Sequence, residues 1–417
     1  MTVAATAVES RGRRVGQPRT RRLPAAFWAV AACHFVNRVG GFVQPFLVLY
    51  LTQEHGVSVA TAGAVAAGVG AGSIASELLG GWLSDLIGRR HTMLIGFVGT
   101  AVGLVALGSA DTMPTIWMAA VGLGLVSDLF RPAAMASVAD LLGPADRVRG
   151  YGLVFWAANL GFSVSTVSAG ALAHFGYSLL FWLNAATSIV AALVVWRRIP
   201  ETRTQRPVAA RRALLPVVMR DRLLVALVVV FVVYSALYLQ AFSTLPLAMA
   251  ADGLGTGTYG AVIALNGLVI VVAQPLAARV LGAFDRGRML GVAMLLVGLG
   301  FGLGAVAHTG AAYATSVLVW TVGEIGVAVM FGATFADLAP ADLRGGYLGL
   351  AGSTWSIGSV FGPLAGTALL DWAGGTTLWA SCAVTGVALL AVQWALAPAL
   401  RRRHHREISG DGVVDAG

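Results

Sequence analysis

Long apolar segments follow one another along almost the whole chain, and short polar connections separate them. Each segment is at least about 20 residues long, which is the length that an α-helix needs to cross a lipid bilayer. Backbone that meets lipid must form its hydrogen bonds within the segment, so runs of this length are helical. The twelve segments are 25–51, 58–84, 91–110, 113–140, 150–174, 176–197, 221–249, 257–281, 288–308, 311–337, 344–372 and 375–400. The sequence therefore predicts an all-α integral membrane protein with twelve transmembrane helices.

Composition excludes a soluble domain, because 57% of the residues are hydrophobic and 11% are charged, against about a quarter charged in soluble domains. The net charge of +9 does not indicate nucleic-acid binding, because the arginines alternate between connections. They occupy both tails and every second connection, whereas connections such as QEHG and ADGLGTG contain none. The positive-inside rule then predicts that both termini and the long middle connection are cytoplasmic. We expect a multi-pass protein of the cell membrane.

A Pro- and Arg-rich break at residues 197–222 divides the segments into six and six. Polar residues of the two halves recur at a constant spacing of 196 residues, in the pairs Asp128 and Glu324, Asp146 and Asp342, and Tyr151 and Tyr347. Such a repeat predicts two six-helix bundles of similar fold. The expected units are an N-terminal tail (1–24), an N-terminal bundle (25–200), a linker (201–220), a C-terminal bundle (221–400) and a C-terminal tail (401–417), with the linker and both tails cytoplasmic.

The stretch ELLGGWLSDLIGRR, residues 77–90, joins the second and third segments. Its glycines let helices approach closely and let the chain turn sharply at a membrane face. Its aspartate lies beside arginines at a helix end, where an ion pair would have to break if the helices moved apart. The residues of this gating motif are Glu77, Gly81, Asp85, Gly88, Arg89 and Arg90.

This stretch resembles the loop between the second and third transmembrane helices of the major facilitator superfamily, whose pattern is Gly-x-x-x-Asp-Arg/Lys-x-Gly-x-Arg/Lys-Arg/Lys. The matching residues are Gly81, Asp85, Gly88, Arg89 and Arg90. Leu86 stands where the family usually has a base. The resemblance implies the major facilitator fold, in which two six-helix pseudo-repeat bundles enclose a substrate site near the bilayer midplane.

Ionisable residues inside apolar segments are costly in a membrane and indicate functional positions. Arg38 lies in the middle of the first segment, Asp128 and Arg131 lie in the fourth, and Glu324 lies in the middle of the tenth. Segments one, four, seven and ten line the cavity in facilitator folds, so the resemblance implies that these side chains reach it. We expect Arg38 to reach across to one of the acids.

Two interpretations fit Asp128 and Arg131, which lie three residues apart and can share a helix face. They form a structural ion pair, or the acid leaves its arginine during a transport cycle and takes up a proton. Glu324 has no base one turn away on its helix, so we favour it as the proton or cation site over a protonated packing residue. Glu77 is expected to join the gating network with Arg131 or Arg149.

His34 and Asn37 lie within about one turn of Arg38 in CHFVNRVGGF. This stretch is reminiscent of the proton-coupled peptide symporters, which carry Glu-x-x-Glu-Arg at that place in the first helix. His34 and Asn37 replace both glutamates, which argues against peptide transport. His34 is either a packed polar residue or a proton relay.

Aromatic and amide residues supply the candidate substrate cage. An apolar, aromatic cavity with few fixed polar groups suits lipophilic or cationic compounds better than sugars. Aromatic residues at such positions also commonly face lipid. The candidates are Trp156, Asn159, Tyr234, Tyr238, Gln240, Asn266 and Trp355.

Residues 131–170 resemble the fourth and fifth spans of the drug:proton antiporter branch of the superfamily. That branch carries a Gly-Pro pair in its fifth span, which kinks the helix and seals the outward path. Ser165 and Thr166 stand there in this chain, and the pair occurs in the eleventh segment as Gly362 and Pro363, preceded by Gly358. The resemblance therefore favours export.

We expect a transporter and not an enzyme. The chain has no lysine, which a P-loop ATPase requires, and no HExxH or GxSxG motif. Cys33 and Cys382 lie in apolar segments without CxxC spacing and are expected to be packing residues.

The leading hypothesis is proton-coupled efflux of small lipophilic compounds, such as drugs or secondary metabolites, by alternating access. The proton gradient is the expected energy source, with no cofactor, no metal and no nucleic acid. The expected partners are a small-molecule substrate, protons and the lipid bilayer, and the chain is expected to work as a monomer. The alternatives are proton-coupled uptake of a small metabolite and a non-transporting membrane receptor on the same fold.

Overall fold

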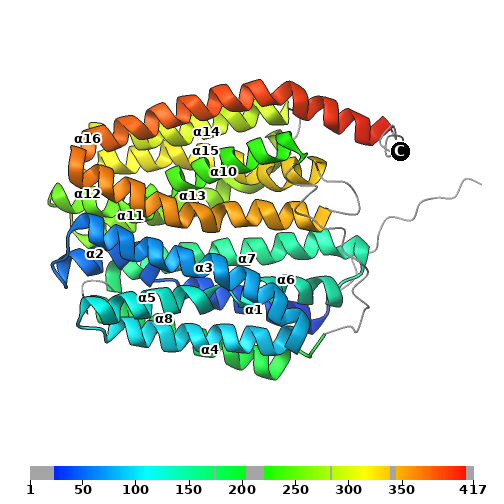
Figure 1. Ribbon diagram of the computed structural model, residues 1–417, viewed down its shortest axis with the longest axis horizontal. Helices are drawn as coiled ribbons and strands as arrows, with labels where there is room; N and C mark the ends of the chain where they lie inside the picture. The colour runs from blue at the N-terminus through cyan, green and yellow to red at the C-terminus, as the bar shows by residue number, and fades with distance from the viewer. Residues whose placement is uncertain (1–22, 173–174, 203–219, 282–283, 339–343, 410–417) are drawn as a thin grey trace, which may run out of the picture.

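The computed structural model describes residues 23–172, 175–202, 220–281, 284–338 and 344–409, and these ranges are helical with no strand (Figure 1). The first half contains α1 (Ala25–Val39), α2 (Val43–Gln53), α3 (Val59–Ile87), α4 (Arg89–Gly108), α5 (Met113–Ser127), α6 (Phe130–Leu141), α7 (Pro144–Leu172) and α8 (Tyr177–Arg198). The second half contains α10 (Arg222–Tyr238), α11 (Gln240–Ser243), α12 (Leu245–Ala251), α13 (Thr256–Leu281), α14 (Arg286–Gly302), the short 3-10 helix η2 (Leu303–Ala305), α15 (Gly310–Leu338) and α16 (Arg344–Ser409).

Polar side chains at the N-caps fix where several helices begin, because the first backbone N–H groups of a helix lack partners within it. Ser58 accepts from the backbone of Thr61 at the start of α3, at 3.1 Å. Asp221 accepts from Leu224 N–H at the start of α10, at 3.2 Å. Asp285 likewise begins α14. These caps lie in the polar connections that separate the apolar segments.

Three of the predicted spans contain breaks. Segment 25–51 is divided into α1 and α2 at residues 40–42, and segment 113–140 into α5 and α6 at residues 128–129. Segment 221–249 is divided into α10, α11 and α12. The breaks place non-helical backbone next to the polar residues that the sequence analysis singled out.

Helix α16 has 66 residues, and Gly374 is the residue inside it with non-helical dihedral angles, φ 80° and ψ 171°. A straight helix of that length would be roughly 100 Å long, against a hydrocarbon core of about 30 Å. Figure 1 shows α16 turning back into two antiparallel arms. It therefore covers both predicted segments, 344–372 and 375–400, and its helix continues to Ser409 within the predicted tail 401–417.

Within the described ranges, nine helical stretches are long and apolar enough to cross a membrane. One of these stretches, Leu350–Arg403, contains both arms of α16. The all-α membrane fold is confirmed, whereas the count of twelve spans stays a prediction. The predicted boundaries of the two bundles also stay predictions, and residues 1–22, 203–219 and 410–417 of the predicted tails and linker lie outside the described residues.

The two halves meet along α3 and the first arm of α16, and along α7 and α13. Small residues allow this approach: a Cβ atom on Gly70 of α3 would lie 2.6 Å from the carbonyl oxygen of Ser359 on α16. A Cβ on Gly267 of α13 would lie 2.9 Å from the Cβ of Ser163 on α7. Such contacts between small residues are the usual way that membrane helices come close together.

Candidate functional site

Glu324 lies in the middle of α15, and neutral donors from two other helices hold its carboxylate. Tyr238 of α10 donates its hydroxyl to Oε1 at 2.8 Å. The amide Nδ2 of Asn266 on α13 lies 2.6 Å from Oε2 and 2.9 Å from the hydroxyl of Thr321, three residues before the acid. Among the described residues, Glu324 has no arginine partner. The structure thus brings three of the predicted site residues together around one carboxyl group.

Aromatic rings pack together on one side of Glu324. The ring of Tyr238 meets Trp355 edge-on with centroids 5.3 Å apart, and meets Trp320 edge-on at 5.8 Å. Tyr234 stacks on Tyr238 at 6.4 Å and meets Trp355 at 6.0 Å. Trp320 is fully buried, and its Nε1 has no hydrogen-bond partner among the described residues. Three of the predicted cage residues, Tyr234, Tyr238 and Trp355, therefore pack together next to Glu324; we call these three rings the aromatic cage, and its role in holding a substrate stays a prediction.

A second, charged cluster lies in the first half. Arg131 on α6 contacts Oε1 of Glu77 at 2.9 Å and Oδ1 of Asp128 at 3.5 Å. Asp128 occupies the break between α5 and α6, where its backbone N–H donates to the hydroxyl of Ser76 at 3.2 Å. The expected pairing of Glu77 with Arg131 is present, and the side chain of Arg149 lies outside the described residues. Both interpretations of Asp128 start from this ion pair.

Ser356 connects this charged cluster to the second half. Its hydroxyl donates to Oε2 of Glu77 at 2.8 Å, across the contact between α16 and α3. Glu77 is therefore held by Arg131 from its own half and by Ser356 from the other half. Ser356 is a site residue that the sequence does not reveal, because no pattern within one segment shows which serine faces a distant acid.

Arg38 lies between the two clusters. It is close enough to Asp128 and Arg131 of the first half and to Tyr238 of the second half to interact with them electrostatically. In the described part of the chain its guanidinium forms no hydrogen bond or ion pair. The guanidinium is therefore placed near both clusters without being fixed to either, and a direct pair with one of the acids, as expected from the sequence, is not formed here.

His34 and Asn37 surround Arg38 on α1 without joining either cluster. His34 is 7% exposed and packs against the ring of Phe130 at 5.3 Å, and its Nε2 has no partner among the described atoms. Asn37 is half-buried and makes no side-chain hydrogen bond within the described ranges. His34 thus has the packing of a buried aromatic residue.

Two candidates on α7 lie apart from the cage. Trp156 is 51% exposed, and the amide of Asn159 donates to its own helix at Phe155 O, 3.0 Å away. The α7 residue that contacts an aromatic ring of the second half is Phe162, edge-on to Phe242 at 5.8 Å. Gln240 donates to the carbonyl of Gly362 and so ties α11 to α16.

The gating motif forms a network within the first half. Arg89 pairs with Asp85 at 3.1 Å, as expected from the sequence, and with Asp140 on α6 at 3.3 Å. The carboxylate of Glu201, just after α8, accepts from the backbone N–H of Arg89 at 2.8 Å and of Arg90 at 3.2 Å. Glu201 thereby caps the N-terminus of α4 from 112 residues away. Asp140 and Glu201 were not foreseen, since neither lies in the motif.

The motif glycines differ in their surroundings. Gly88 has φ +100° and ψ 163°, and a Cβ there would lie 2.3 Å from Glu201 Oε2. A Cβ on Gly80 would lie 2.6 Å from the carbonyl of Leu129, whereas a Cβ on Gly81 would meet nothing within 4 Å. Of the pair Gly80 and Gly81, from which close helix approach is expected, Gly80 makes it in this structure and Gly81 faces open space.

The predicted helix-kink residues serve as close contacts. A Cβ on Gly358 would lie 2.0 Å from the hydroxyl of Ser235, and one on Gly362 would lie 3.0 Å from the carbonyl of Ala236, so both glycines let α16 approach α10. Pro363 lies within the helix. The non-helical dihedral angles inside α16 occur at Gly374, and the kink expected at the Gly362 and Pro363 pair stays a prediction. Gly374 adopts this positive φ readily because glycine has no side chain.

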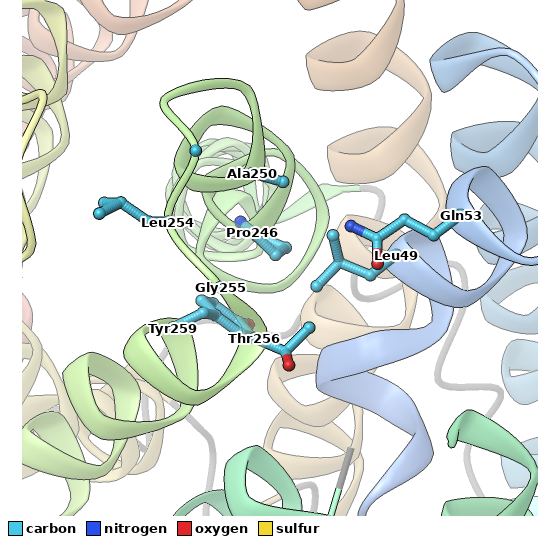
Figure 2. A pocket seen from close by; sticks show the side chains of 9 residues that line it. Leu49, Gln53, Pro246, Ala250, Leu254, Gly255, Thr256 and Tyr259 are labelled. Carbon is cyan, nitrogen blue, oxygen red and sulfur yellow. The ribbon is translucent and has the colours of Figure 1, made fainter. Parts of the chain in front are cut away.

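A cavity of about 340 Å³ lies between the halves, at the end of α2. Figure 2 shows Leu49 and Gln53 of α2 facing Pro246 and Ala250 of α12 across it. The hydroxyl of Tyr177 holds Gln53 by donating to its amide oxygen at 2.8 Å. No residue of the predicted site lines this cavity.

The family model of the Major Facilitator Superfamily matches residues 30–257 and 241–413, which together span most of the chain. The chain belongs to the Major Facilitator Superfamily. This protein is therefore a multi-pass membrane transporter of that superfamily, and the resemblance seen at residues 77–90 is confirmed.

Relatives named for different activities resemble the chain over most of its length. The chain is 26% identical over 359 residues to the uncharacterised MFS-type transporter YqjV of Bacillus subtilis, covering 83% of this chain and 86% of the relative. It is 26% identical over 361 residues to the multidrug resistance protein MdtH of Aeromonas salmonicida, covering 85% and 89%. It is 24% identical over 366 residues to a Na⁺, Li⁺, K⁺/H⁺ antiporter of Planococcus maritimus, covering 79% and 86%.

Solved structures of the superfamily share the fold. A POT family transporter in complex with a thioalcohol-conjugated peptide superposes with a TM-score of 0.79 at 14% identity, covering 91% of this chain and 99% of the other. A peptide transporter of the same group superposes with a TM-score of 0.75 at 18% identity, covering 91% and 96%. At these identities the likeness shows the facilitator fold alone.

Proposed function

We propose that this facilitator exports small lipophilic compounds in exchange for protons. Residues 25–200 and 221–400 would rock against each other and open the central site alternately to the two sides of the cell membrane. Both termini would lie in the cytoplasm, in keeping with the alternating arginines of the connections. A single chain would suffice, with the proton gradient as its energy source.

The observation that carries this proposal is the environment of Glu324. Its carboxylate lies in the middle of a membrane helix and receives hydrogen bonds from Tyr238 and Asn266, both neutral. An ionised carboxyl group without a positive partner in such surroundings is stabilised by taking up a proton. Its charge would therefore change as the site is exposed to one side and then the other, which is the requirement for proton coupling.

The charged cluster in the first half would respond to the same movement. Glu77 is held by Arg131 within its half and by Ser356 from the other half. Separation of α3 from α16 would remove the Ser356 hydroxyl and leave Arg131 to divide its charge between Glu77 and Asp128. Arg38 would then balance whichever cluster carries the larger negative charge, because it lies near both and is fixed to neither.

The aromatic cage supports a lipophilic substrate. Tyr234, Tyr238 and Trp355 present ring faces and edges beside a single carboxyl group. Rings attract apolar and cationic molecules, and sugars would need more hydrogen-bonding partners. The relative MdtH, named a multidrug resistance protein, supports the same class of substrate.

A second candidate function is exchange of monovalent metal cations for protons. The Planococcus maritimus relative is named for that activity. In this reading Glu324 would bind the cation and the proton in turn, and the aromatic cage would be a packing element.

Inside-out membrane vesicles test these proposals. With an imposed proton gradient, wild-type vesicles are expected to take up ethidium, and a protonophore is expected to abolish the uptake. Glu324→Gln is expected to abolish the proton-driven part, whereas Glu54→Gln, an exposed acid at the end of α2, is expected to retain it. Proton release on addition of Na⁺ or K⁺, without any dye transport, would favour cation exchange. Proton-driven dye uptake that persists in Glu324→Gln would overturn the assigned role of Glu324.

A further inference from the structure

Asn266 occupies an unusual place in the Glu324 site. It is 1% exposed, and its amide lies between the carboxylate of Glu324 and the hydroxyl of Thr321. Its Nδ2 faces both groups, and its Oδ1 is buried with no hydrogen-bond partner in the described part of the chain. A half-turn of the amide would place the NH2 group at this position instead, so each of the two arrangements leaves one buried polar group without a partner, and neither is favoured on that ground.

The distance between Asn266 and Glu324 also fits a second arrangement of the amide. The two atoms are 2.6 Å apart, below the usual N–H···O range of about 2.7–3.2 Å and within the O–H···O range of about 2.5–3.0 Å. An amide oxygen and an amide nitrogen occupy nearly the same volume, so a half-turn of the amide exchanges them with little change in packing. The site therefore fits a carboxylic acid that donates to Oδ1 as well as it fits a carboxylate that accepts from Nδ2.

We propose that the side-chain amide of Asn266 turns by half a rotation when Glu324 changes its protonation state. This inference rests on the proposed proton coupling at Glu324. With Glu324 ionised, Nδ2 donates to Oε2 and to the hydroxyl oxygen of Thr321. With Glu324 protonated, Oδ1 accepts from the new O–H group and from the hydroxyl of Thr321.

Thr321 makes the two arrangements nearly equal. Its hydroxyl now donates to the carbonyl of Val317 at 2.6 Å, and that carbonyl belongs to the helix ladder. A hydroxyl hydrogen rotates freely, so the same group donates to Oδ1 once the amide has turned. Asn266 has two partners in each arrangement. Proton uptake forms one O–H bond on Oε2 with a proton from solvent and breaks no covalent bond within the protein. The turn replaces the two hydrogen bonds from Nδ2 with two to Oδ1, and the hydrogen bond from Thr321 to Val317 is given up.

The groups that contact the carboxyl group of Glu324 are neutral, and the nearby cation, Arg38, forms no ion pair with it in the described part of the chain. Helix α10 supplies Tyr234 and Tyr238, and α1 supplies Arg38, which interacts electrostatically with Tyr238. Helix α13 contributes Asn266, and α16 contributes Trp355 through its contact with Tyr238. No further acidic or basic side chain of the described residues contacts the carboxyl group. The neutral amide is thus the group whose orientation depends most directly on the charge of Glu324.

Infrared difference spectroscopy of the purified protein tests this without a substrate. Spectra recorded across a pH titration are expected to contain a carboxylic C=O band that is absent from Glu324→Gln. In protein labelled with ¹³C,¹⁵N-asparagine, a side-chain amide band is expected to change at the same pH midpoint. Both the amide change and its isotope shift are expected to disappear in Asn266→Leu and to persist in the control Asn184→Leu, a buried asparagine on α8.

The titration midpoint gives a second measure. Leucine at position 266 removes a hydrogen bond that favours the ionised form more than its counterpart favours the acid, because hydrogen bonds to charged groups are the stronger ones. The midpoint of the Glu324 band is therefore expected to rise by about one to two pH units in Asn266→Leu. A carboxyl band that titrates in the wild type with no asparagine band changing alongside it would overturn the amide turn.

The experiments distinguish failure of proton coupling at Glu324 from failure of the amide turn at Asn266. If the carboxyl band never appears and proton-driven ethidium uptake survives in Glu324→Gln, the proposed function fails together with this inference. If the carboxyl band titrates and Glu324→Gln is uncoupled, but the labelled asparagine band stays constant, only the role of Asn266 is wrong. The labelled wild-type spectrum decides this even if Asn266→Leu does not fold.

Discussion

Glu324 and Arg131 show two ways of keeping a charge inside a membrane protein. Arg131 is balanced by two acids, and Glu324 is held by neutral donors. A balanced charge stabilises one conformation, whereas a carboxyl group among neutral donors responds to proton concentration. The repeat therefore places an acid at Asp128 and at Glu324, and their neighbours give the two positions different chemistry.

The motif glycines allow a test at the level of single residues. Gly88→Ala is expected to lower the free energy of unfolding by about 1–3 kcal/mol, because its backbone conformation is accessible mainly to glycine and a Cβ would displace Glu201. Gly81→Ala is the matched control and is expected to change it by less than about 0.5 kcal/mol, since its Cβ would meet open space. Thermal unfolding of the detergent-solubilised protein measures both. Equal losses in the two variants would contradict the assigned role of Glu201.

The sequence shows which charged residues are costly to bury in a membrane, but it does not show which groups contact them. A charge in an apolar segment stands out, so Arg38, Asp128, Arg131 and Glu324 were identified from the sequence. Serines such as Ser356 are common in membrane helices. The packing of α16 against α3 brings the hydroxyl of Ser356 within hydrogen-bond distance of Glu77. Thr321 could have been found, since it lies three residues before Glu324 on one helix face.

Two helix starts in the second half are held by ion pairs with the end of α16. Arg403, near the end of α16, contacts Asp221 at 2.7 Å, and Asp221 also caps α10 and accepts from the hydroxyl of Tyr347. Arg401 reaches Asp285, which caps α14. The end of α16 thus holds the starting points of α10 and α14. In the first half Glu201 does the same for α4 with the opposite charge.

Arg403→Gln tests this connection between elements. It is expected to lower stability by about 1–3 kcal/mol, because the buried carboxylate of Asp221 would lose its charged partner. Arg402→Gln is the matched control: Arg402 is exposed and has no partner in the described part of the chain, and its loss is expected to have little effect. Thermal unfolding in detergent compares them. A loss for Arg402→Gln as large as that for Arg403→Gln would show that net charge, and not the pair, matters.

The ends of helices were predictable from the sequence where an apolar segment meets a polar connection. They were not predictable where packing against other helices determines where a helix breaks. Apolar length predicted the helical segments, and the polar connections predicted where most of them end. The breaks at 40–42 and 128–129 lie inside apolar runs, where the freed backbone groups still need hydrogen-bond partners. Local carbonyls accept from the backbone N–H groups of residues 40–42, whereas another helix supplies a partner at residue 128. Ser76 does so for Asp128, and no sequence pattern indicates that contact.

At the scale of the whole molecule, the two halves touch through small residues on two pairs of helices, α3 with α16 and α7 with α13. Figure 1 shows the helices of the second half lying along those of the first. Small residues give close backbone contacts at these two places, and the rings of Phe162 and Phe242 meet edge-on elsewhere between the halves. An interface of this kind suits halves that rock against each other.

Joining α7 to α13 covalently would test that movement. A Cβ on Gly267 would lie 2.9 Å from that of Ser163, so cysteines at both positions are within disulfide reach after a small shift. In a Cys33→Ala, Cys382→Ala background, oxidation of the Ser163→Cys, Gly267→Cys variant is expected to abolish proton-driven ethidium uptake, and reduction is expected to restore it. Each single cysteine variant controls for the substitutions themselves, and loss of maleimide labelling verifies the cross-link. Undiminished uptake with the cross-link complete would mean that the halves do not separate along α7 and α13 during transport.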